Sequence, residues 1–162
     1  MVDIRMATLA DIPEIVACAL GCFPSSDPVT TSSFFEKYLL SPLEIVYVAE
    51  SGGHIVGHVV ATMLTDELEE DEDEWREGHI SWVGVHPTHR KLGIAAKLMT
   101  AAEKALVQEY GCEYVELHVR VSNLAAVNLY TNILGYSLLC TEDKYFNDGE
   151  DAYVMYKELP GT

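Results

Sequence analysis

The segment HRKLGIAAKLM, residues 89–99, places Arg90, Lys91 and Lys97 around Gly93, although the chain has only ten basic side chains and a formal net charge of -16. An apolar helical period begins just after Gly93. The first turn of a helix offers unpaired N–H groups and the positive end of the helix dipole. Gly93 and Ala95 keep this turn slim enough for a ligand to approach the backbone. We therefore expect an anion-binding site here.

The spacing of RKLGIA excludes two common anion-binding motifs. It matches neither the GxxxxGK[ST] pattern of a P-loop nor the GxGxxG pattern of a dinucleotide-binding fold. Two interpretations remain open from these residues alone. One is a cradle for a phosphate group, and the other is an ordinary helix start whose basic side chains are solvated.

Two histidines on predicted strands and one tyrosine on a predicted helix are candidates for proton transfer. In VELHVRV, Val115, Leu117 and Val119 alternate, which places His118 on the opposite face. His79 lies in the strand-like segment GHIS, and Tyr130 lies in AAVNLYTNIL at helical spacing. A strand histidine is either a structural group or a base, and a tyrosine at this spacing is either core or an acid. The residues alone leave these alternatives open.

The histidines and cysteines give no metal-binding pattern. His86 and His89 are spaced like a ligand pair, but we find no third ligand nearby, so no metal site is expected. The four cysteines form no CxxC pair and no finger-like Cys/His spacing. We expect them to be buried, reduced thiols.

The elements that position these candidates alternate between helical and strand periods. A turn signal, SGG, joins two strands, and Gly84 interrupts another strand, where we expect a bulge or a close backbone approach. The order predicts an α/β fold in which helices flank a mixed, largely antiparallel sheet. The predicted strands are 2–7, 44–50, 54–64, 78–85, 113–119, 136–142 and 151–159, and the predicted helices are 8–20, 33–40, 95–110 and 122–134.

Length and composition predict one domain over residues 1–162, with an acidic surface loop at about 66–77 that repels itself and packs poorly. At 49% hydrophobic residues the chain can form a substantial core. Its beginning has charged residues in place of an apolar signal core, and no apolar run is long enough to span a bilayer. We therefore expect a cytoplasmic protein. Its negative charge argues against direct binding to nucleic acid or an anionic membrane.

The segment RKLGIA resembles the R/Q-x-x-G-x-G/A signature of the GNAT acetyltransferases. Three longer blocks, GHISWVGVHPTHRKLGIAAKLM, YVELHVRVSNLAAVNLYTNILGY and KYFNDGEDAYVM, resemble the catalytic subunit of NatA-type N-terminal acetyltransferases. The resemblance runs from residue 2 to about residue 159. It implies a GNAT fold whose central strands splay apart in a V-shaped slot.

The resemblance also implies where acetyl-CoA binds. The pyrophosphate would lie on the backbone amides of Arg90, Lys91, Leu92, Gly93, Ile94 and Ala95. A backbone N–H between Val83 and Val85 would face the thioester oxygen, where negative charge develops. Asn123 resembles the family residue that bonds the pantetheine arm, and it also fits a helix cap.

Acetyl transfer to an amine needs a neutral nucleophile, a stabilised oxyanion and a proton for the leaving thiolate. By resemblance, Tyr130 is the acid, His118 is the base and His79 is a second candidate base. A terminal α-amine is roughly a tenth neutral at pH 7, whereas a lysine is neutral to only about a few parts in ten thousand. A modest base is therefore sufficient for an α-amine.

By resemblance, two loops hold the substrate peptide. Tyr145 and Phe146 resemble an aromatic pair that covers the peptide backbone. Phe23, Pro24, Ser25 and Asp27 lie on the facing loop. NatA-type subunits usually have LPE there, and this chain has FPSSD, so Ser25 replaces a glutamate that selects or deprotonates the N-terminus. Asp27 is a possible substitute for that glutamate.

The resemblance implies an acetyl-CoA-dependent enzyme that acetylates protein N-termini, with small first residues such as Ser, Ala and Thr, or acidic ones when the chain acts alone. Its partners would be nascent polypeptides and a large helical-repeat auxiliary subunit that docks on the ribosome. The alternatives are a RimI-like, lysine or small-amine acetyltransferase, and a non-catalytic acetyl-CoA-binding scaffold. Peptides that differ only in their first residue separate the enzyme classes.

Overall fold

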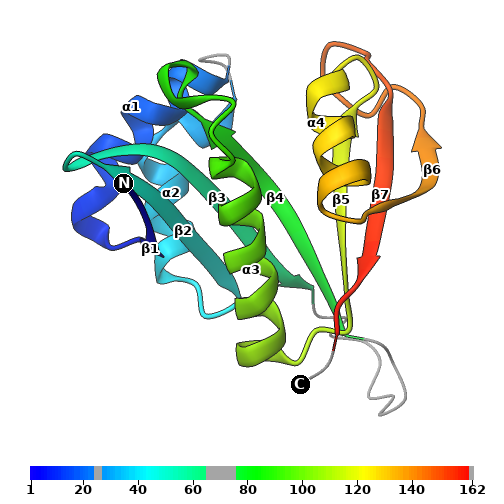
Figure 1. Cartoon of the computed structure of the whole chain (residues 1–162), viewed down its shortest axis with the longest axis horizontal. Coiled ribbons are helices and arrows are strands. Elements are labelled where there is room, and N and C mark those ends of the chain that lie inside the picture. Colours follow the sequence, from blue (N-terminus) through cyan, green and yellow to red (C-terminus); the bar gives the residue numbers. More distant parts are fainter. Residues whose placement is uncertain (24–26, 65–75, 161–162) are drawn as a thin grey trace.

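The computed structural model describes residues 1–23, 27–64 and 76–160. Strands and helices follow one another in the order expected from the sequence (Figure 1). The strands are β1 Val2–Met6, β2 Glu44–Ser51, β3 His54–Leu64, β4 Glu77–Val85, β5 Tyr114–Arg120, β6 Ser137–Glu142 and β7 Ala152–Glu158. The helices are α1 Ile12–Cys22, α2 Ser32–Leu40, α3 Ile94–Tyr110 and α4 Leu124–Asn128, and short 3-10 turns precede α1, α2 and α3.

The strands form one seven-stranded sheet in the order β1-β2-β3-β4-β5-β7-β6. Every neighbouring pair is antiparallel except β4 and β5, which are parallel. The parallel pairing covers only Glu77 to Ile80 on β4 and Tyr114 to Leu117 on β5, and the two strands separate beyond it (Figure 1). The predicted mixed sheet and its splay between central strands are confirmed.

The helices cover the sheet on both faces (Figure 1). α3 packs on β2, β3 and β4 on one face, and its core extends to β5 and to the segment after α4. α1 and α2 pack on β2 and β3 on the opposite face, where they form a second core. The sheet therefore separates two apolar layers, and a side chain on a central strand belongs to one or the other by its place in the alternation.

The β2–β3 hairpin follows from its two glycines. Gly52 and Gly53 have φ values of +57° and +80°, which side-chain-bearing residues rarely adopt. Ser51 pairs with His54 across them, so the turn has two residues, as the SGG signal predicts.

One extra residue in β4 changes which side chains face α1 and α2. Val60 of β3 pairs with Trp82, but the next residue, Ala61, pairs with Ile80, which leaves Ser81 as a bulge. The bulge expected at Gly84 is therefore wrong in position. At Gly84 the structure has a close approach of side chains instead, because an added Cβ would lie 3.0 Å from a ring carbon of His58 and 3.0 Å from one of Phe23.

Two further expectations need correction in detail. The predicted helix 122–134 is an α-helix only as far as Asn128, and Leu129–Ile133 form a π-helical turn. The cysteines are free, but only Cys18 and Cys112 are buried, since Cys22 is half-buried and Cys140 is exposed. Cys140 is exposed because β6 is an edge strand whose residues all face solvent.

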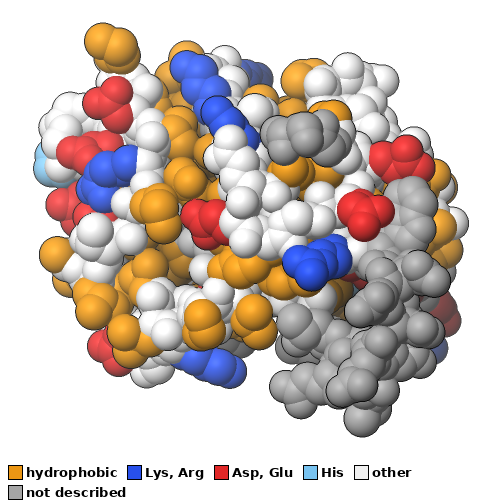
Figure 2. All heavy atoms as spheres, turned by 90° about the horizontal axis from the view of Figure 1, so that it is seen from below, with side chains coloured by type: hydrophobic (Ala, Val, Ile, Leu, Met, Phe, Trp, Pro, Cys, Tyr) orange, Lys and Arg blue, Asp and Glu red, His pale blue; other side chains and the backbone are white. Residues whose placement is uncertain are grey.

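Most of the acidic loop predicted at 66–77 lies outside the described residues, and its last residue, Glu77, begins β4. Among the described residues, no helix is long and apolar enough to cross a membrane. Viewed from the end where β2 begins, hydrophobic side chains reach the surface among charged ones (Figure 2). Leu40 and Leu43, which precede β2, are 71% and 37% exposed.

Candidate functional site

The separation of β4 from β5 opens the sheet at its centre. Beyond Ile80 and Leu117, β4 remains paired with β3, and β5 remains paired with β7. Within the described ranges, the facing edges of β4 and β5 therefore have no partner strand there, so their backbone groups can bond a ligand. Val83 and Val85, which were expected to face the thioester, lie on this open part of β4.

The predicted anion loop lies beside this opening, at the start of α3. Lys91 and Gly93 have φ values of 63° and 77°, and Gly93 is the residue that precedes the helix. Such left-handed residues at a helix start turn successive N–H groups toward one concave surface, which suits a phosphate. A Cβ on Gly93 would meet no atom within 4 Å, so the glycine is needed for its backbone angle. The residues therefore fit a diphosphate.

The side chains of this loop divide by burial. Ile94 is 2% exposed and anchors the first turn in the α3-side core, whereas Leu92 is 61% exposed. Arg90 is exposed, and its Nε donates to the carbonyl of Val85 at 3.1 Å, which ties the loop to the end of β4. Ala95 is half-buried in the first turn of α3.

Asn123 lies across the opening at the start of α4. Its side-chain oxygen accepts from the N–H of Ala126 at 3.2 Å, so the helix cap expected as its structural role is present. Its contact with pantetheine stays a prediction.

His79 and His118 meet where the two strands begin to separate. His79 Nε2 lies 3.3 Å from His118 Nδ1. His118 Nε2 lies 3.4 Å from a carboxylate oxygen of Glu142, and Tyr145 stacks on the His118 ring with centroids 4.2 Å apart. Both candidate bases expected from the sequence therefore lie in one group at the base of the opening.

The electrostatics of this group separate the two histidines. Burial, and then the charge of His118, lowers the pKa of His79 to about 4. His79 is therefore neutral at pH 7. Close by, burial and then the carboxylate of Glu77 raise the pKa of Glu116 to about 7, so this carboxyl titrates near neutrality.

Tyr130 approaches the opening from the other face of the sheet. It lies in the π-helical turn after α4, is 6% exposed and packs in the core on the α3 side. Burial raises its pKa to about 12, so its hydroxyl keeps its proton at neutral pH. Leu117 and Val119 point into this same core, so His118, between them on β5, points to the opposite face. The candidate acid and the candidate base thus lie on the two sides of one gap.

The aromatic loop between β6 and β7 is held by charged side chains. Arg120 donates to Asp148 at 2.8 Å and to Glu150 at 3.1 Å, and its guanidinium lies 4.1 Å from the ring centre of Phe146. Tyr145, 45% exposed, lies edge-on to Phe146. The predicted pair is therefore fixed beside His118.

The facing loop is described only in part. Phe23 ends α1 and packs edge-on against Trp82, with ring centres 5.4 Å apart. Pro24 and Ser25 lie outside the described residues. Asp27 is half-buried, and its carbonyl accepts from the N–H of Thr30 at 3.1 Å.

Two polar residues near the histidines, Ser81 and Glu142, were not found from the sequence, whereas the alternation in VELHVRV places Glu116 on the face of His118. The alternation in GHIS could have placed Ser81 on the face of His79, because the two residues are two apart on one strand. No sequence signal places Glu142 beside His118, since that contact depends on the register of β6 against β7 and of β7 against β5.

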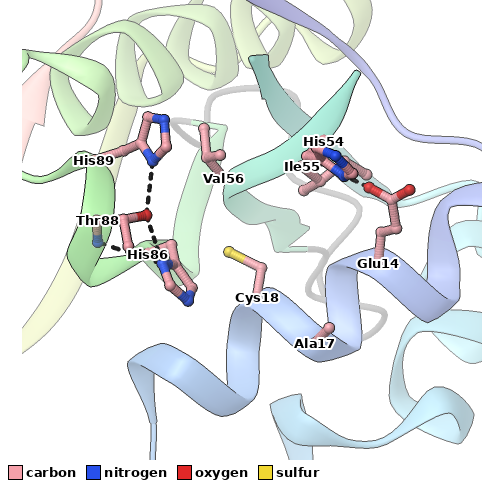
Figure 3. Close-up of a pocket in the computed structure, with 9 residues that line it drawn as sticks. All are labelled: Glu14, Ala17, Cys18, His54, Ile55, Val56, His86, Thr88 and His89. Atoms are coloured by element: carbon pink, nitrogen blue, oxygen red, sulfur yellow. Dashed lines mark hydrogen bonds between the residues drawn. The ribbon is translucent and has the colours of Figure 1, made fainter. Parts of the chain in front are cut away.

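A separate pocket of about 390 Å³ lies between α1, the start of β3 and the turn before α3 (Figure 3). His86 Nδ1 and His89 Nδ1 each lie 2.8 Å from the Thr88 hydroxyl (Figure 3). The hydroxyl therefore contacts both of the ring nitrogens that a shared ligand of the two histidines would use. In the described part of the chain, no three His, Cys, Asp or Glu side chains come together as a metal site.

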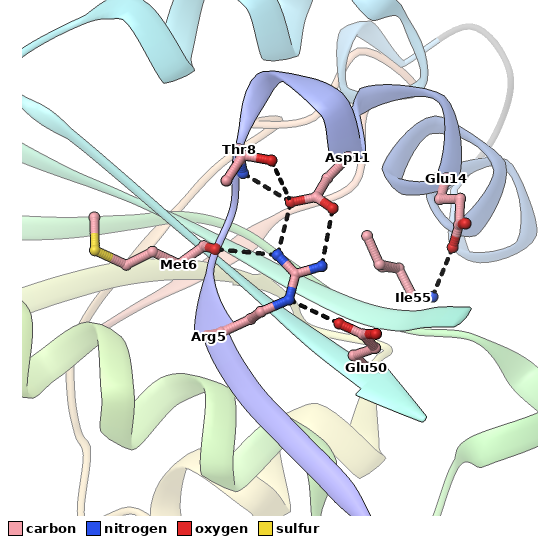
Figure 4. Close-up of polar contacts among 7 residues, drawn as sticks. All are labelled: Arg5, Met6, Thr8, Asp11, Glu14, Glu50 and Ile55. Carbon is pink, nitrogen blue, oxygen red and sulfur yellow. Dashed lines mark hydrogen bonds and ion pairs between the residues drawn. The ribbon is translucent and has the colours of Figure 1, made fainter. Parts of the chain in front are cut away.

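An ionic cluster around Arg5 serves the fold. Arg5 on β1 forms ion pairs with Asp11 at 2.8 Å and with Glu50 at 2.7 Å (Figure 4). Asp11 also accepts from the N–H of Thr8, which completes a capping box at the start of the first helical segment, and Arg5 is the main cause that lowers the pKa of Asp11 to about 2. The cluster fastens β1 to the start of α1, away from the opening in the sheet.

Comparison with known proteins agrees with this geometry. The model of the acetyltransferase (GNAT) family matches residues 12–136. The chain is 48% identical over 162 residues to the "N-terminal acetyltransferase A complex catalytic subunit NAA10" of Arabidopsis thaliana, covering 99% of this chain and 80% of the relative. It is 40% identical to the "N-alpha-acetyltransferase daf-31" of Caenorhabditis elegans, covering 97% of this chain and 82% of the relative.

Solved structures share the fold. Arabidopsis thaliana NAA60 in complex with acetyl-CoA matches with a TM-score of 0.83 at 22% identity, covering 99% of this chain and all of the other. Chaetomium thermophilum Naa20 in complex with a bisubstrate analogue matches with a TM-score of 0.80 at 25% identity, covering 97% of this chain and 86% of the other.

Proposed function

The chain belongs to the acetyltransferase (GNAT) family, and from this we propose that it transfers the acetyl group of acetyl-CoA to the α-amino group of protein N-termini. The relatives that share 37% to 48% of its residues over nearly its whole length are named for this activity. One structural observation carries the proposal to this chain's own residues. His118 lies at the base of the open strand pair, beneath the exposed ring of Tyr145.

The amine is activated by His118. A peptide entering beneath Tyr145 and Phe146 brings its α-ammonium group to His118 Nε2, which accepts one proton and leaves a neutral amine to attack the acetyl carbon. The imidazolium that forms is then stabilised by the Glu142 carboxylate, 3.4 Å from Nε2. His79 supports His118 through the contact at 3.3 Å and stays neutral.

Acetyl-CoA binds by its diphosphate to the N–H groups at the start of α3, with Arg90 and Lys91 as neighbouring cations. Its pantetheine arm lies along the open edge of β4, where a backbone N–H between Val83 and Val85 bonds the thioester oxygen. Tyr130 gives its proton to the leaving thiolate from the other face of the sheet, and it is reprotonated by the second proton that the attacking nitrogen loses as the amide forms. The raised pKa of Tyr130 keeps that proton available at neutral pH.

The finer features of the proposal rest on the resemblance to NatA-type enzymes. Two relatives are named as catalytic subunits of a complex, which supports an auxiliary subunit as a partner here. We propose small first residues on the substrate, a helical-repeat auxiliary subunit that reaches the ribosome, a cytoplasmic location and a single domain. The segment FPSSD, with Ser25 in place of the family glutamate, is where this chain's own preference is set.

The test is acetyl transfer from acetyl-CoA to peptides that begin with Ser, Ala, Thr, Asp, Glu or Met, followed by thiol release and mass spectrometry. The control peptide has a blocked N-terminus and an internal lysine. We expect acetylation at the α-amine and none on the control. Lysine acetylation alone, or tight acetyl-CoA binding without thiol release, contradicts the proposal.

Two variants connect the activity to the site. Tyr130→Phe removes the phenolic proton but keeps the ring, so we expect kcat to fall while acetyl-CoA affinity is kept. Gly93→Asp puts a carboxylate in the anion site and a side chain at φ 77°, so we expect acetyl-CoA binding to be lost in calorimetry. If Tyr130→Phe has wild-type activity, Tyr130 is not part of the site. If Gly93→Asp has wild-type affinity for acetyl-CoA, Gly93 is not part of it.

A further inference from the structure

A row of polar side chains crosses the sheet on the face that α1 and α2 cover. Glu44 of β2 is the cross-strand partner of Thr62 on β3, and Thr62 is the partner of His79 on β4. Ser81 follows His79 at the bulge, and His118 of β5 lies beyond His79. The strand register thus aligns a carboxylate, two hydroxyls and two imidazoles in one row.

Each neighbour in the row is within contact distance of the next. Thr62 Oγ1 donates to Glu44 Oε2 at 2.5 Å, and the hydroxyls of Thr62 and Ser81 are 3.2 Å apart. Ser81 Oγ lies 3.5 Å from His79 Nδ1, and His79 Nε2 lies 3.3 Å from His118 Nδ1. The contact at 3.5 Å is the longest, so it is where the row is most easily interrupted.

Counting hydrogens gives the row a single direction. An ionised Glu44 only accepts, so the one hydroxyl proton of Thr62 is used on it. Thr62 must then accept from Ser81, whose own proton is used in turn. Ser81 can therefore only accept from His79, which must carry its proton on Nδ1.

The same count continues into the proposed base. A neutral His79 with its proton on Nδ1 has a lone pair on Nε2, so it accepts from Nδ1–H of His118. Neutral His118 then has its own lone pair on Nε2. That nitrogen is the one that faces Glu142 and the proposed substrate site.

We infer that Glu44, Thr62 and Ser81 are positioning residues which, through His79, hold His118 in the tautomer whose Nε2 can accept a proton from the substrate amine. This inference deepens the proposed function and rests on it. The carboxylate that fixes the base is therefore three strands away from it, with β3 and β4 between them. One proton enters at His118 Nε2, and no other bond changes in the row.

At one end of the row, burial and the neighbouring polar groups act on the pKa of Glu44 in opposite directions. Burial raises the pKa of Glu44, while the hydrogen bond from Thr62 and the charge of Lys37 oppose that rise and favour the carboxylate. Tyr38 and Tyr110 also face Glu44, and its charge contributes to their raised pKa values.

At the other end, the groups around His118 are His79, Tyr145, Glu142 and Glu116. Glu142 lies 3.4 Å from Nε2, where its carboxylate can pair with the proton that the substrate amine transfers. Glu116, next to Glu77, titrates near neutrality because burial and that carboxylate raise its pKa to about 7, so its own contribution to any pH profile has to be measured.

The first test reads the tautomers directly. Histidine ¹⁵N shifts of the whole chain are measured by NMR at neutral pH for wild type, Thr62→Val and Thr62→Ser. We expect Nδ1–H on both His79 and His118 in wild type and in Thr62→Ser, which keeps the hydroxyl. In Thr62→Val we expect His79 to change to Nε2–H or to a mixture.

The second test reads the consequence for catalysis. We expect Thr62→Val and Ser81→Ala each to lower kcat about 3- to 10-fold with little change in the KM for acetyl-CoA, and to flatten the acid limb of the rate profile. Thr62→Ser should restore most of the rate. Thr100→Val is the matched control, because Thr100 is exposed on α3 and donates only to the Ala96 carbonyl.

The two tests separate failure of this inference from failure of the proposed function. Nε2–H on His79 in wild type, or identical tautomers and rates in Thr62→Val, overturns the inference even if the enzyme acetylates peptides. If the expected tautomers are observed but the chain acetylates no N-terminus, the inference about the row stands and the proposed function is overturned.

Discussion

His58 and His79, on neighbouring strands and on the same face of the sheet, show what burial alone does to a histidine and what neighbours add. Burial lowers the pKa of His58 to about 4, and that of His79 is lowered equally, mainly by burial. His58 is fully buried between the edges of Phe23 and Phe35, and neither of its ring nitrogens has a hydrogen-bond partner among the described residues. His79 has Ser81 on one nitrogen and His118 on the other.

A lowered pKa therefore does not by itself identify a functional histidine. Both rings are neutral at pH 7 for the same reason. Only His79 has partners that fix which nitrogen holds the proton, and only His79 passes that choice to a second imidazole. The environment of His58 is a packed aromatic layer, so we assign it a structural role.

The largest effect expected from this comparison is on turnover. His118→Gln removes the base at the end of the polar row, so kcat should fall by about 10²- to 10³-fold. His58→Leu, a change of similar volume in the apolar layer, should leave kcat within a few-fold. Steady-state kinetics on a Ser-starting peptide compare the two. Similar losses in both variants would break the distinction between the two histidines.

The next effect is on stability against acid. The folded pKa of His58, about 4, lies below its unfolded value of about 6.5, so the unfolded state binds the proton first. Stability is therefore full above about pH 6.5 and is lost as the pH falls toward 4. Between pH 7 and pH 4.5, protonation of His58 should lower the free energy of unfolding of the wild type by about 2–3 kcal/mol, and His58→Leu should lack this decrease.

Urea unfolding at pH 7 and at pH 4.5 measures this free energy for each protein. Thr100→Val is the control variant, and its free energy of unfolding should depend on pH as that of the wild type does. If the free energy of unfolding falls between pH 7 and 4.5 by the same amount in His58→Leu as in the wild type, His58 is not neutral and buried in the folded state.

The third effect concerns how closely the side chains pack around His58. A methyl group at Gly84 would lie 3.0 Å from the His58 ring and 3.2 Å from the Cβ of Cys22. Gly84→Ala should therefore destabilise the fold by about 1–3 kcal/mol. The same substitution should cost less in a His58→Ala background, and thermal unfolding of the four proteins gives the coupling. Additive costs would show that His58 is not what Gly84 accommodates.

The smallest effect tests the aromatic cover of His118. Tyr145→Leu removes a ring stacked 4.2 Å above the imidazole, a contact worth about 0.5–1.5 kcal/mol. We expect a 2- to 10-fold loss in kcat/KM for the peptide, with unchanged acetyl-CoA affinity. Tyr145→Phe keeps the ring and should be near wild type. A large loss in Tyr145→Phe would instead assign a role to the hydroxyl.

The sequence by itself determined the parts of this protein that depend on local signals. The capping box at Thr8 and Asp11, the two-glycine turn after Ser51 and the left-handed glycine before α3 act within a few residues of the chain. Periodicity then gave each element its buried face, and so it separated His118 from Leu117 and Val119. These features are readable because their physical causes are short-range.

Tertiary structure alone decided how those elements are joined into a site. Three features depend on residues that are distant along the chain: the bulge at Ser81, the contact of His118 with Glu142, and the row from Glu44 to His118. Within the row, the contact between His79 and His118 joins residues that are 39 positions apart. The orphaned His58 is also defined only by what surrounds it. Such contacts follow from strand register, where a slip of one residue turns every side chain to the other face, and register is fixed by packing of the whole sheet.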